Sequence, residues 1–152
     1  MKNIVIDTCV FIHIVRDTIT GKKCLEELEK YDKAANVIVS VVTKAELESF
    51  ISQNSWGKAK IQKLNKILEE ITYIDISNAD QLLIDSYIEI DAFSKRKTED
   101  KTGNLLKGSA KKMGKNDLWI AATANSLEIP LMTTDGDFDH LNKTLMEIIK
   151  IV

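Results

Sequence analysis

The sequence predicts an α/β protein in which helices cover both faces of a central, mainly parallel sheet of about five strands. Short β-branched apolar runs such as residues 4–6 and 37–42 lack polar alternation, which is typical of strands buried on both faces. These runs alternate along the chain with segments of helical spacing, as helical crossovers between parallel strands require. With 152 residues and 44% hydrophobic composition, we expect one domain over residues 1–152, long enough to bury a core without disulfides.

Composition excludes several classes of protein. A net charge of −2 argues against a protein coated in positive charge for nucleic acid, although a local basic patch stays compatible with it. No apolar run approaches the length of a membrane span, and the N-terminal run is interrupted at Asp7, so we expect a cytoplasmic protein without a secretory signal. Cys9 and Cys24 are too few for a disulfide framework and lack zinc-site spacing, which predicts two free thiols.

The first strand is expected to end at Asp7 and to lead into a short helix over residues 10–16. Thr18 or Thr20 can supply the N-cap hydroxyl of a second helix. The second strand is expected at residues 37–42. Thr43 and Glu46 follow it at the spacing of a capping box, which predicts a helix with Thr43 as its N-cap.

The second half continues the alternation. A helix is expected to open at Ser55, a third strand at 73–76, and a long helix at 79–94 capped by Ser77 or Asn78. Residues 95–115 form a polar interruption with eight basic and two acidic side chains. Asn116 is the expected cap of the next helix, and strands are expected at 130–134 and 146–152 with a short helical turn between them.

Four acids fall where strands end or helices begin: Asp7, Glu46, Asp117 and Asp135. Taken singly, acids in first helical turns and in Asp-Gly turns are common for structural reasons. In a parallel sheet, however, all four are expected at one edge, where ligands bind. Carboxylates gathered in a crevice repel each other unless a cation is bound, and oxygen ligands suit Mg²⁺ or Mn²⁺. The sequence therefore predicts a four-carboxylate metal site.

Other sites are excluded by their spacing. The alternating acids from Asp135 resemble the start of an EF-hand loop, but His140 stands where that loop needs glycine and Met146 where it needs glutamate. No glycine-rich phosphate loop is present, and no local motif supports a Ser–His–Asp triad. We expect structural or surface roles for His13 and His140, and we expect Trp119 to pack between helices.

Four blocks of the sequence resemble the signature blocks of the PIN-domain nucleases, in order and at the expected spacing. Among these enzymes the chain looks most like the VapC-type toxin ribonucleases of bacterial toxin–antitoxin pairs. The blocks are Ile4-Val5-Ile6-Asp7-Thr8, Thr43-Lys44-Ala45-Glu46-Leu47, Asn116-Asp117-Leu118-Trp119-Ile120-Ala121-Ala122-Thr123-Ala124 and Thr133-Thr134-Asp135-Gly136-Asp137-Phe138.

The resemblance implies a PIN-like three-layer α/β/α sandwich and an acidic pocket for Mg²⁺ or Mn²⁺ that cuts RNA. Carried over by position, the catalytic and metal-binding acids are Asp7, Glu46, Asp117 and Asp135. Thr8 and Thr133 match the hydroxyl positions that orient carboxylates, and Asp137 matches an accessory acid. One position departs from the pattern: family members often have asparagine where this chain has Cys9.

We therefore predict a metal-dependent endoribonuclease with one or two ions, acting as the toxin of a type II toxin–antitoxin pair. Lys111, Lys112 and Lys115 are predicted to hold RNA, although a solvated surface loop explains them equally well. The resemblance implies a cognate antitoxin as partner, and we also expect a homodimer. The alternatives are an RNA-processing PIN nuclease without antitoxin, a non-catalytic PIN-like module that binds RNA or protein, and a Mg²⁺-dependent phosphatase or flap-type DNA nuclease.

Overall fold

The computed structural model describes residues 1–152 and contains a five-stranded sheet in which every neighbouring pair of strands is parallel. The spatial order is β3-β2-β1-β4-β5. The predicted parallel α/β architecture is thus confirmed. The strands are β1 (Asn3–Ile6), β2 (Asn36–Ser40), β3 (Thr72–Ile74), β4 (Leu131–Thr133) and β5 (Ile148–Lys150).

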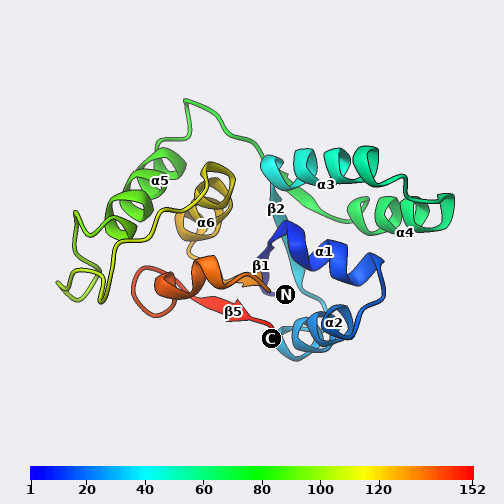
Figure 1. The fold of residues 1–152 in the computed structure, drawn as a ribbon, viewed down its shortest axis with the longest axis horizontal. Helices are drawn as coiled ribbons and strands as arrows, with labels where there is room; N and C mark the ends of the chain where they lie inside the picture. The colour runs from blue at the N-terminus through cyan, green and yellow to red at the C-terminus, as the bar shows by residue number, and fades with distance from the viewer.

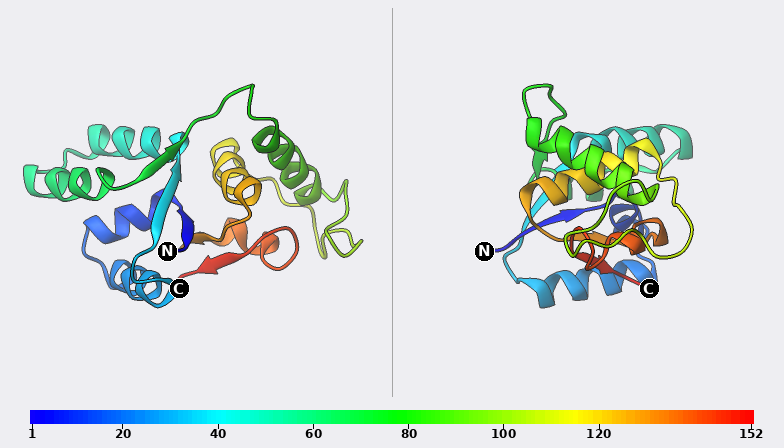
Figure 2. Two further views of the ribbon diagram at one scale, coloured as in Figure 1. Left: turned by 180° about the vertical axis from the view of Figure 1, so that it is seen from behind. Right: turned by 90° about the vertical axis from the view of Figure 1, so that its left-hand side faces the viewer.

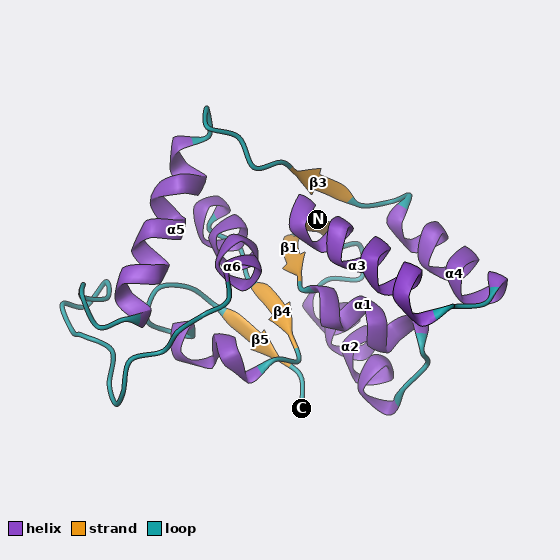
Figure 3. Ribbon diagram, turned by 45° about the horizontal axis from the view of Figure 1, so that its top comes forward, coloured by secondary structure: helices purple, strands orange, loops and turns teal.

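Helices cover both faces of the sheet (Figures 1 and 3), which confirms the three layers. One face carries four helices and the other face carries two, with a 3₁₀ helix before the last strand. The first group is α1 (Thr8–Val15), α2 (Ile19–Tyr31), α3 (Val41–Asn54) and α4 (Lys58–Leu68); the second is α5 (Gln81–Ser94) and α6 (Lys115–Leu127); the 3₁₀ helix is η1 (Gly136–Leu141). None of these helices has the length and apolarity to cross a bilayer.

Strand β1 lies at the centre of the molecule and contributes to two separate cores. Ile4 and Ile6 face the core under α1 to α4, whereas Val5 faces the core under α5 and α6. All three side chains are almost completely buried. Burial of such a side chain stabilises the fold by roughly 1.5–3 kcal/mol. The unbroken apolar run of β1 therefore follows from coverage on both faces.

The order of the strands creates a crevice at the carboxyl ends of β1 and β4. From β1 the chain proceeds outward to β2 and then β3, and it returns through α5 and α6 to place β4 on the opposite side of β1. Connections leave β1 and β4 in opposite directions, which is the arrangement that opens a ligand crevice at a parallel sheet. Asp7 follows β1 directly, and Asp135 follows β4 by two residues.

The predicted boundary between β2 and α3 is wrong. Val41 and Val42 belong to the helix and not to the strand, because Ser40 is the N-cap and its hydroxyl accepts a hydrogen bond from Val42 N (3.2 Å). Thr43 is consequently inside the helix and fully buried instead of forming a capping box. Glu46 therefore lies in the second turn of α3, farther from the strand end than predicted.

Three further helix starts differ from the sequence prediction. Helix α4 begins after Gly57 and not at Ser55, which has a left-handed backbone at the end of α3. Helix α5 is capped by Asp80, whose carboxylate accepts from Leu83 N (3.1 Å). Helix α6 begins one residue before Asn116, after Gly114, which has no side chain to cap it. The Asn116 side chain is thereby left for a contact outside its own helix.

The polar loop between α5 and α6 is fastened to the core although it contains no helix or strand. Leu106 and Met113 are buried in the core beneath α5 and α6. Backbone and side-chain hydrogen bonds also hold it, from Lys111 N to Ser94 O (2.7 Å) and from Arg96 Nε to Leu106 O (2.9 Å). Figure 2 shows this loop at the end of the molecule opposite α3 and α4. The loop is thus a fixed wall of the molecule.

Candidate metal centre

Asp7 is held firmly at the end of β1. Its carboxylate is only 5% exposed and accepts hydrogen bonds from Thr8 N (2.7 Å), Thr133 Oγ1 (2.7 Å) and Cys9 Sγ (3.1 Å). Burial raises the pKa of Asp7, and the three hydrogen bonds partly offset that effect because they favour the charged form. Thr133 also accepts from Asp135 N (3.0 Å), so one hydroxyl links the ends of β1 and β4.

Glu46 is brought to Asp7 through the first residue of α1. Thr8 Oγ1 donates to Glu46 Oε1 (2.8 Å) and lies 3.2 Å from the hydroxyl of buried Thr43. The other oxygen, Glu46 Oε2, accepts from Asn116 Nδ2 (3.4 Å). The charge of Glu46 also contributes, after burial, to raising the pKa of Asp7. We call Asp7 and Glu46 the anchored pair, because neighbouring side chains hold both carboxylates.

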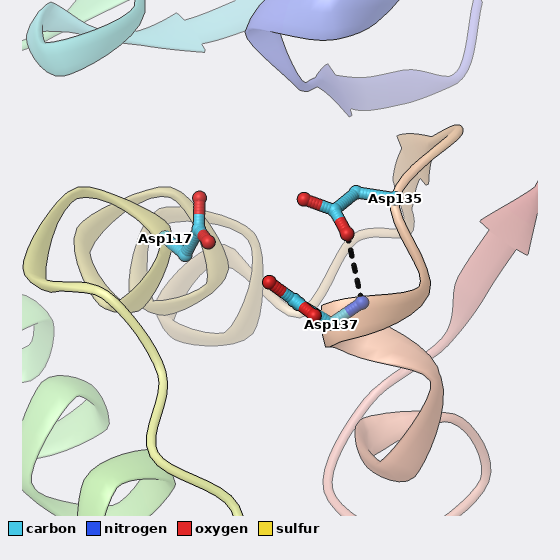
Figure 4. Close-up of side chains that lie close together, drawn as sticks. All are labelled: Asp117, Asp135 and Asp137. Carbon is cyan, nitrogen blue, oxygen red and sulfur yellow. Dashed lines mark hydrogen bonds between the residues drawn. The ribbon is translucent and has the colours of Figure 1, made fainter.

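The remaining acids form a group that we call the open cluster: Asp117, Asp135 and Asp137. One carboxylate oxygen from each lies within 4.8 Å of the others, and Figure 4 shows the side chains of Asp135 and Asp137 directed toward Asp117. Asp117 comes from the first turn of α6, Asp135 is the N-cap of η1, and Asp137 lies in the first turn of η1. One hydrogen bond forms within the cluster, from Asp137 N to Asp135 Oδ1 (2.9 Å).

The charges of these acids act on one another. The pKa of Asp117 is raised to about 7, first by burial and then by the negative charges of Asp7, Asp135, Glu46 and Asp137. None of the five acids forms an ion pair with a lysine or arginine. At neutral pH the site therefore concentrates negative charge that no ion pair offsets.

These residues fit a hard divalent cation. The open cluster offers three oxygen ligands at mutual distances that one ion can bridge, and no nitrogen or sulfur ligand lies among them. Mg²⁺ and Mn²⁺ prefer such carboxylate ligands, and a bound cation would remove the repulsion that raises the pKa of Asp117. The carboxylate oxygens of the open cluster are therefore suitable ligands for the predicted Mg²⁺ or Mn²⁺ ion.

Only some of the predicted site residues lie in the open cluster. Asp117 and Asp135 meet in the open cluster, and Asp137, expected only as an accessory acid, meets them there. Asp7 and Glu46 are not in that group, but their charges act on Asp117. The hydroxyls of Thr8 and Thr133 contact the acids as their expected orienting role requires.

Cys9 contacts the anchored pair directly. Its thiol donates to Asp7 Oδ2 and lies 3.6 Å from Thr133 Oγ1. Burial, and then the charge of Asp7, raise the pKa of Cys9 to about 11, so the side chain stays protonated and keeps its hydrogen to donate. Cys9 and Cys24 are both free, as predicted.

A hollow lined by lysines and acids adjoins the open cluster. It has a volume of about 420 Å³, and Lys111 and Lys112 line it together with Asp137, Asp139 and His140; Asp139 is paired with Lys150. His140 Nε2 lies 2.7 Å from the hydroxyl of buried Ser94, which ties this wall to α5. Lys115 begins α6 and is exposed, but it does not line the hollow. We call this space the lysine hollow.

Thr43 and Asn116 help to position Glu46, a role that the sequence does not predict. The sequence predicts both as helix caps, whereas Thr43 contacts Thr8 and Asn116 contacts Glu46. Thr43 precedes Glu46 by three residues, about one helical turn, which was a usable signal. For Asn116 the sequence held no signal beyond its position next to Asp117. Trp119 stacks on Tyr87 of α5 (4.3 Å between centroids), as its predicted interhelical role requires.

The fold and site define a parallel α/β protein with a carboxylate centre at its topological switch point. The sequence profile of the PIN domain matches residues 4–144, nearly the whole chain. The chain therefore belongs to the PIN domain family. No curated protein sequence gives a significant match.

Solved structures with the same fold come from complexes of the VapBC type. The fold is similar to a chain in VapBC2 from Rickettsia felis bound to a promoter DNA fragment, with a TM-score of 0.74, 19% identity and 99% of each chain covered. It is also similar to a chain in VapBC-1 from nontypeable Haemophilus influenzae, with a TM-score of 0.68, 19% identity and 97% of each chain covered. A third similar structure is VapBC-5, a toxin–antitoxin member from Mycobacterium tuberculosis (TM-score 0.58, 24% identity, 99% and 100% covered).

Proposed function

We propose that this protein is a metal-dependent endoribonuclease that hydrolyses RNA phosphodiester bonds at the five acids, as the toxin of a toxin–antitoxin pair acting in the cytoplasm. The observation that carries the proposal is the open cluster beside the anchored pair, in which carboxylates from separate segments lie close enough to bind one cation. Membership of the PIN domain family supports the nuclease activity, and the VapBC structures support the toxin role.

Asp117, Asp135 and Asp137 are the residues that would hold Mg²⁺ or Mn²⁺, with Asp7 and Glu46 beside them as further carboxylates. When bound, the ion would act as a Lewis acid and lower the pKa of a water molecule for attack on phosphorus. Thr133 and Cys9 fix the Asp7 carboxylate, and Thr8 and Asn116 fix Glu46, so the acids need little rearrangement when the site is used. No side-chain nucleophile is required.

The lysine hollow is the proposed contact for the RNA backbone. An acidic centre repels phosphates, and Lys111 and Lys112 supply positive charge next to Asp137. The loop that carries these lysines is attached to the core through Ser94 and Met113, which favours an ordered binding surface over a freely solvated loop. Lys115 contributes charge at the start of α6, outside the hollow.

A protein partner is proposed for the opposite face. An apolar hollow of about 220 Å³ lies between α1, α2 and the end of α4, and nine of its ten lining residues are hydrophobic, including Phe11, Leu28 and Ile71. Leu25 on its rim is 49% exposed. Such a groove accepts an amphipathic segment, and an antitoxin is the proposed occupant. The expected homodimer stays a prediction.

The decisive experiment is cleavage of single-stranded RNA, single-stranded DNA and a phosphomonoester, each with Mn²⁺ and with EDTA. Mn²⁺-dependent internal cleavage of RNA alone is the expected result. Cleavage confined to DNA or to the phosphomonoester would contradict the ribonuclease assignment. No cleavage of any substrate, with RNA still bound, would favour a non-catalytic module.

The lysine contact is tested by changing Lys111, Lys112 and Lys115 together to Gln. RNA binding should weaken, and the slope of log affinity against log salt should fall by about 0.7 for each phosphate that the variant no longer neutralises. The matched control changes three exposed lysines of the opposite layer, Lys22, Lys23 and Lys33, to Gln. Equal losses of RNA affinity in both triple variants would show that Lys111, Lys112 and Lys115 are ordinary surface lysines.

A further inference from the structure

A second hollow adjoins the acids on the surface of α3. Its volume is about 410 Å³, and it is lined by Ala45, Glu46, Ser49, Phe50, Gln53 and Asn116. It shares Glu46 and Asn116 with the anchored side of the metal centre, whereas the lysine hollow shares Asp137 with the open cluster. No lining residue is common to the two hollows. The acids are therefore flanked by two spaces of different chemistry.

The walls of this second hollow do not suit a phosphate. They contain no lysine or arginine, and the Glu46 carboxylate makes them negative. What they offer is one aromatic ring, Phe50, surrounded by the hydroxyl of Ser49 and the amides of Gln53 and Asn116. A flat apolar face with neutral donors and acceptors around it matches a nucleobase, which has a π-face and a polar edge.

The Phe50 ring is held in place by its neighbours. Trp56 packs edge-to-face against it with centroids 5.3 Å apart, and the Arg16 guanidinium carbon lies 5.0 Å from the Phe50 centroid. Lys60 Nζ in turn lies 5.9 Å from the centroid of Trp56. Two rings thus lie between two cations, which come from the end of α1 and from α4. Aromatic rings interleaved with basic side chains are typical of surfaces that bind single-stranded nucleic acid.

Polar groups at the rim are arranged to contact a base edge. Gln53 Nε2 donates to Ser49 Oγ (2.9 Å), which leaves the Gln53 carbonyl oxygen as an acceptor. Asn116 Nδ2 donates one hydrogen to Glu46 Oε2, with 3.4 Å between the two atoms. The second amide hydrogen and the carbonyl oxygen of Asn116 stay available for a ligand. The rim thus presents both donors and acceptors within one small space.

We propose that this hollow is a nucleobase subsite, in which a base next to the scissile phosphate of single-stranded RNA stacks on Phe50 while Ser49, Gln53 and Asn116 contact its edge. The hollow is shallow and open to solvent, so a base lying in it can stay continuous with the rest of a single strand. This inference rests on the proposed ribonuclease function. It divides recognition between two surfaces: the lysine hollow binds backbone charge, and the α3 hollow binds a base.

The test measures binding of labelled single-stranded hexaribonucleotides, oligo(A) and oligo(U), by fluorescence anisotropy with Mn²⁺. The background is the Asp117→Asn variant, so that no strand is cut. Phe50→Leu should weaken binding by about tenfold, since stacking on an aromatic side chain contributes on that order. The same change should not alter binding of a hexamer of abasic ribose-phosphate, and it should not alter the salt slope.

Two matched variants separate stacking from loss of structure. Phe50→Tyr keeps the ring and should retain oligo(A) binding within about twofold, because a tyrosine ring stacks equally well. Gln53→Ala should change the ratio of oligo(A) to oligo(U) affinity. Circular dichroism and thermal unfolding of each variant would show whether the Phe50–Trp56 contact still supports the fold.

The outcomes distinguish the subsite from the function on which it rests. If Phe50→Leu weakens binding of the abasic hexamer as much as that of oligo(A), or weakens neither, the subsite is wrong while Mn²⁺-dependent cleavage by the unchanged protein still stands. If the unchanged protein neither cleaves nor binds RNA, the proposed function fails and the subsite fails with it.

Discussion

The anchored pair and the open cluster contain the same chemical group in opposite situations. Asp7 and Glu46 are met by hydroxyl, thiol and amide donors from three other segments. Asp117, Asp135 and Asp137 face mainly each other, and burial together with the charges of Asp7 and the other acids raises the pKa of Asp117 to about 7. The protein thus supplies hydrogen-bond donors to the anchored pair but leaves the negative charge of the open cluster without such partners from other segments. A cation would bind at the open cluster.

The largest effect is expected from the open cluster. Asp117→Asn removes a proposed ligand and should reduce Mn²⁺-dependent RNA cleavage by about a thousandfold or more, since a metal ion contributes several kcal/mol to the transition state. Initial rates on a single-stranded RNA measure this loss. The matched control is Asp75→Asn, at an exposed position outside the site. Full activity in Asp117→Asn would contradict the assignment of the site.

A smaller effect is expected from the anchored pair. Thr133→Val keeps the shape of the side chain but removes the donor to Asp7 and the acceptor for Asp135 N. We expect a loss of about 1–3 kcal/mol in unfolding free energy and of roughly 10–100-fold in activity. Urea unfolding and cleavage rates measure the two effects. The control is Thr72→Val, at an exposed position of β3, and equal losses in both variants would argue against a special role for Thr133.

Asp117 should also make the stability of the protein depend on pH. Because the pKa of Asp117 is raised in the folded protein from 3.8 to about 7, the folded state binds the proton more tightly than the unfolded chain. Stability from this group is therefore fully present below about pH 4 and is lost as the pH rises toward 7.

The measurement is the unfolding temperature in EDTA between pH 4 and 8, compared with Asp117→Asn. The difference between the two proteins should grow in favour of the variant as the pH rises. Saturating Mn²⁺ at pH 7.5 should remove that difference by stabilising the unchanged protein by several degrees. A difference that does not depend on pH would show that the acids of the open cluster do not interact as described.

The smallest effect is expected at Cys9. A thiol is a weak donor, and Thr133 and Thr8 N also hold Asp7, so Cys9→Ala should reduce cleavage only about two- to fivefold. Cys9→Ser, which keeps a donor, should restore most of the rate. Cleavage assays of the two variants at one Mn²⁺ concentration decide this. A loss from Cys9→Ala as large as that from Thr133→Val would mean that the thiol is a principal support of Asp7.

Much of the fold followed from local patterns. Ile4, Val5 and Ile6 predicted a strand buried on both faces, and the two cores on either side of β1 confirm it. Asp7 and Asp135 were placed correctly at strand ends, because a strand of a parallel sheet must end at the ligand-binding edge. Helix starts were less predictable: a hydroxyl or carboxylate near a boundary shows that a cap is available, but it does not show which residue the cap uses.

The layers, the parallel strands and the acids at one edge can be predicted from the sequence, since strand period, helix spacing and strand ends are properties of short segments. The support of those acids follows from the packing of distant segments. Whether Thr43 caps α3 or contacts Thr8, and whether Asn116 caps α6 or contacts Glu46, depends on distances between segments that lie far apart in the chain. The same holds for Phe50, whose hollow exists because α3 lies beside the start of α6.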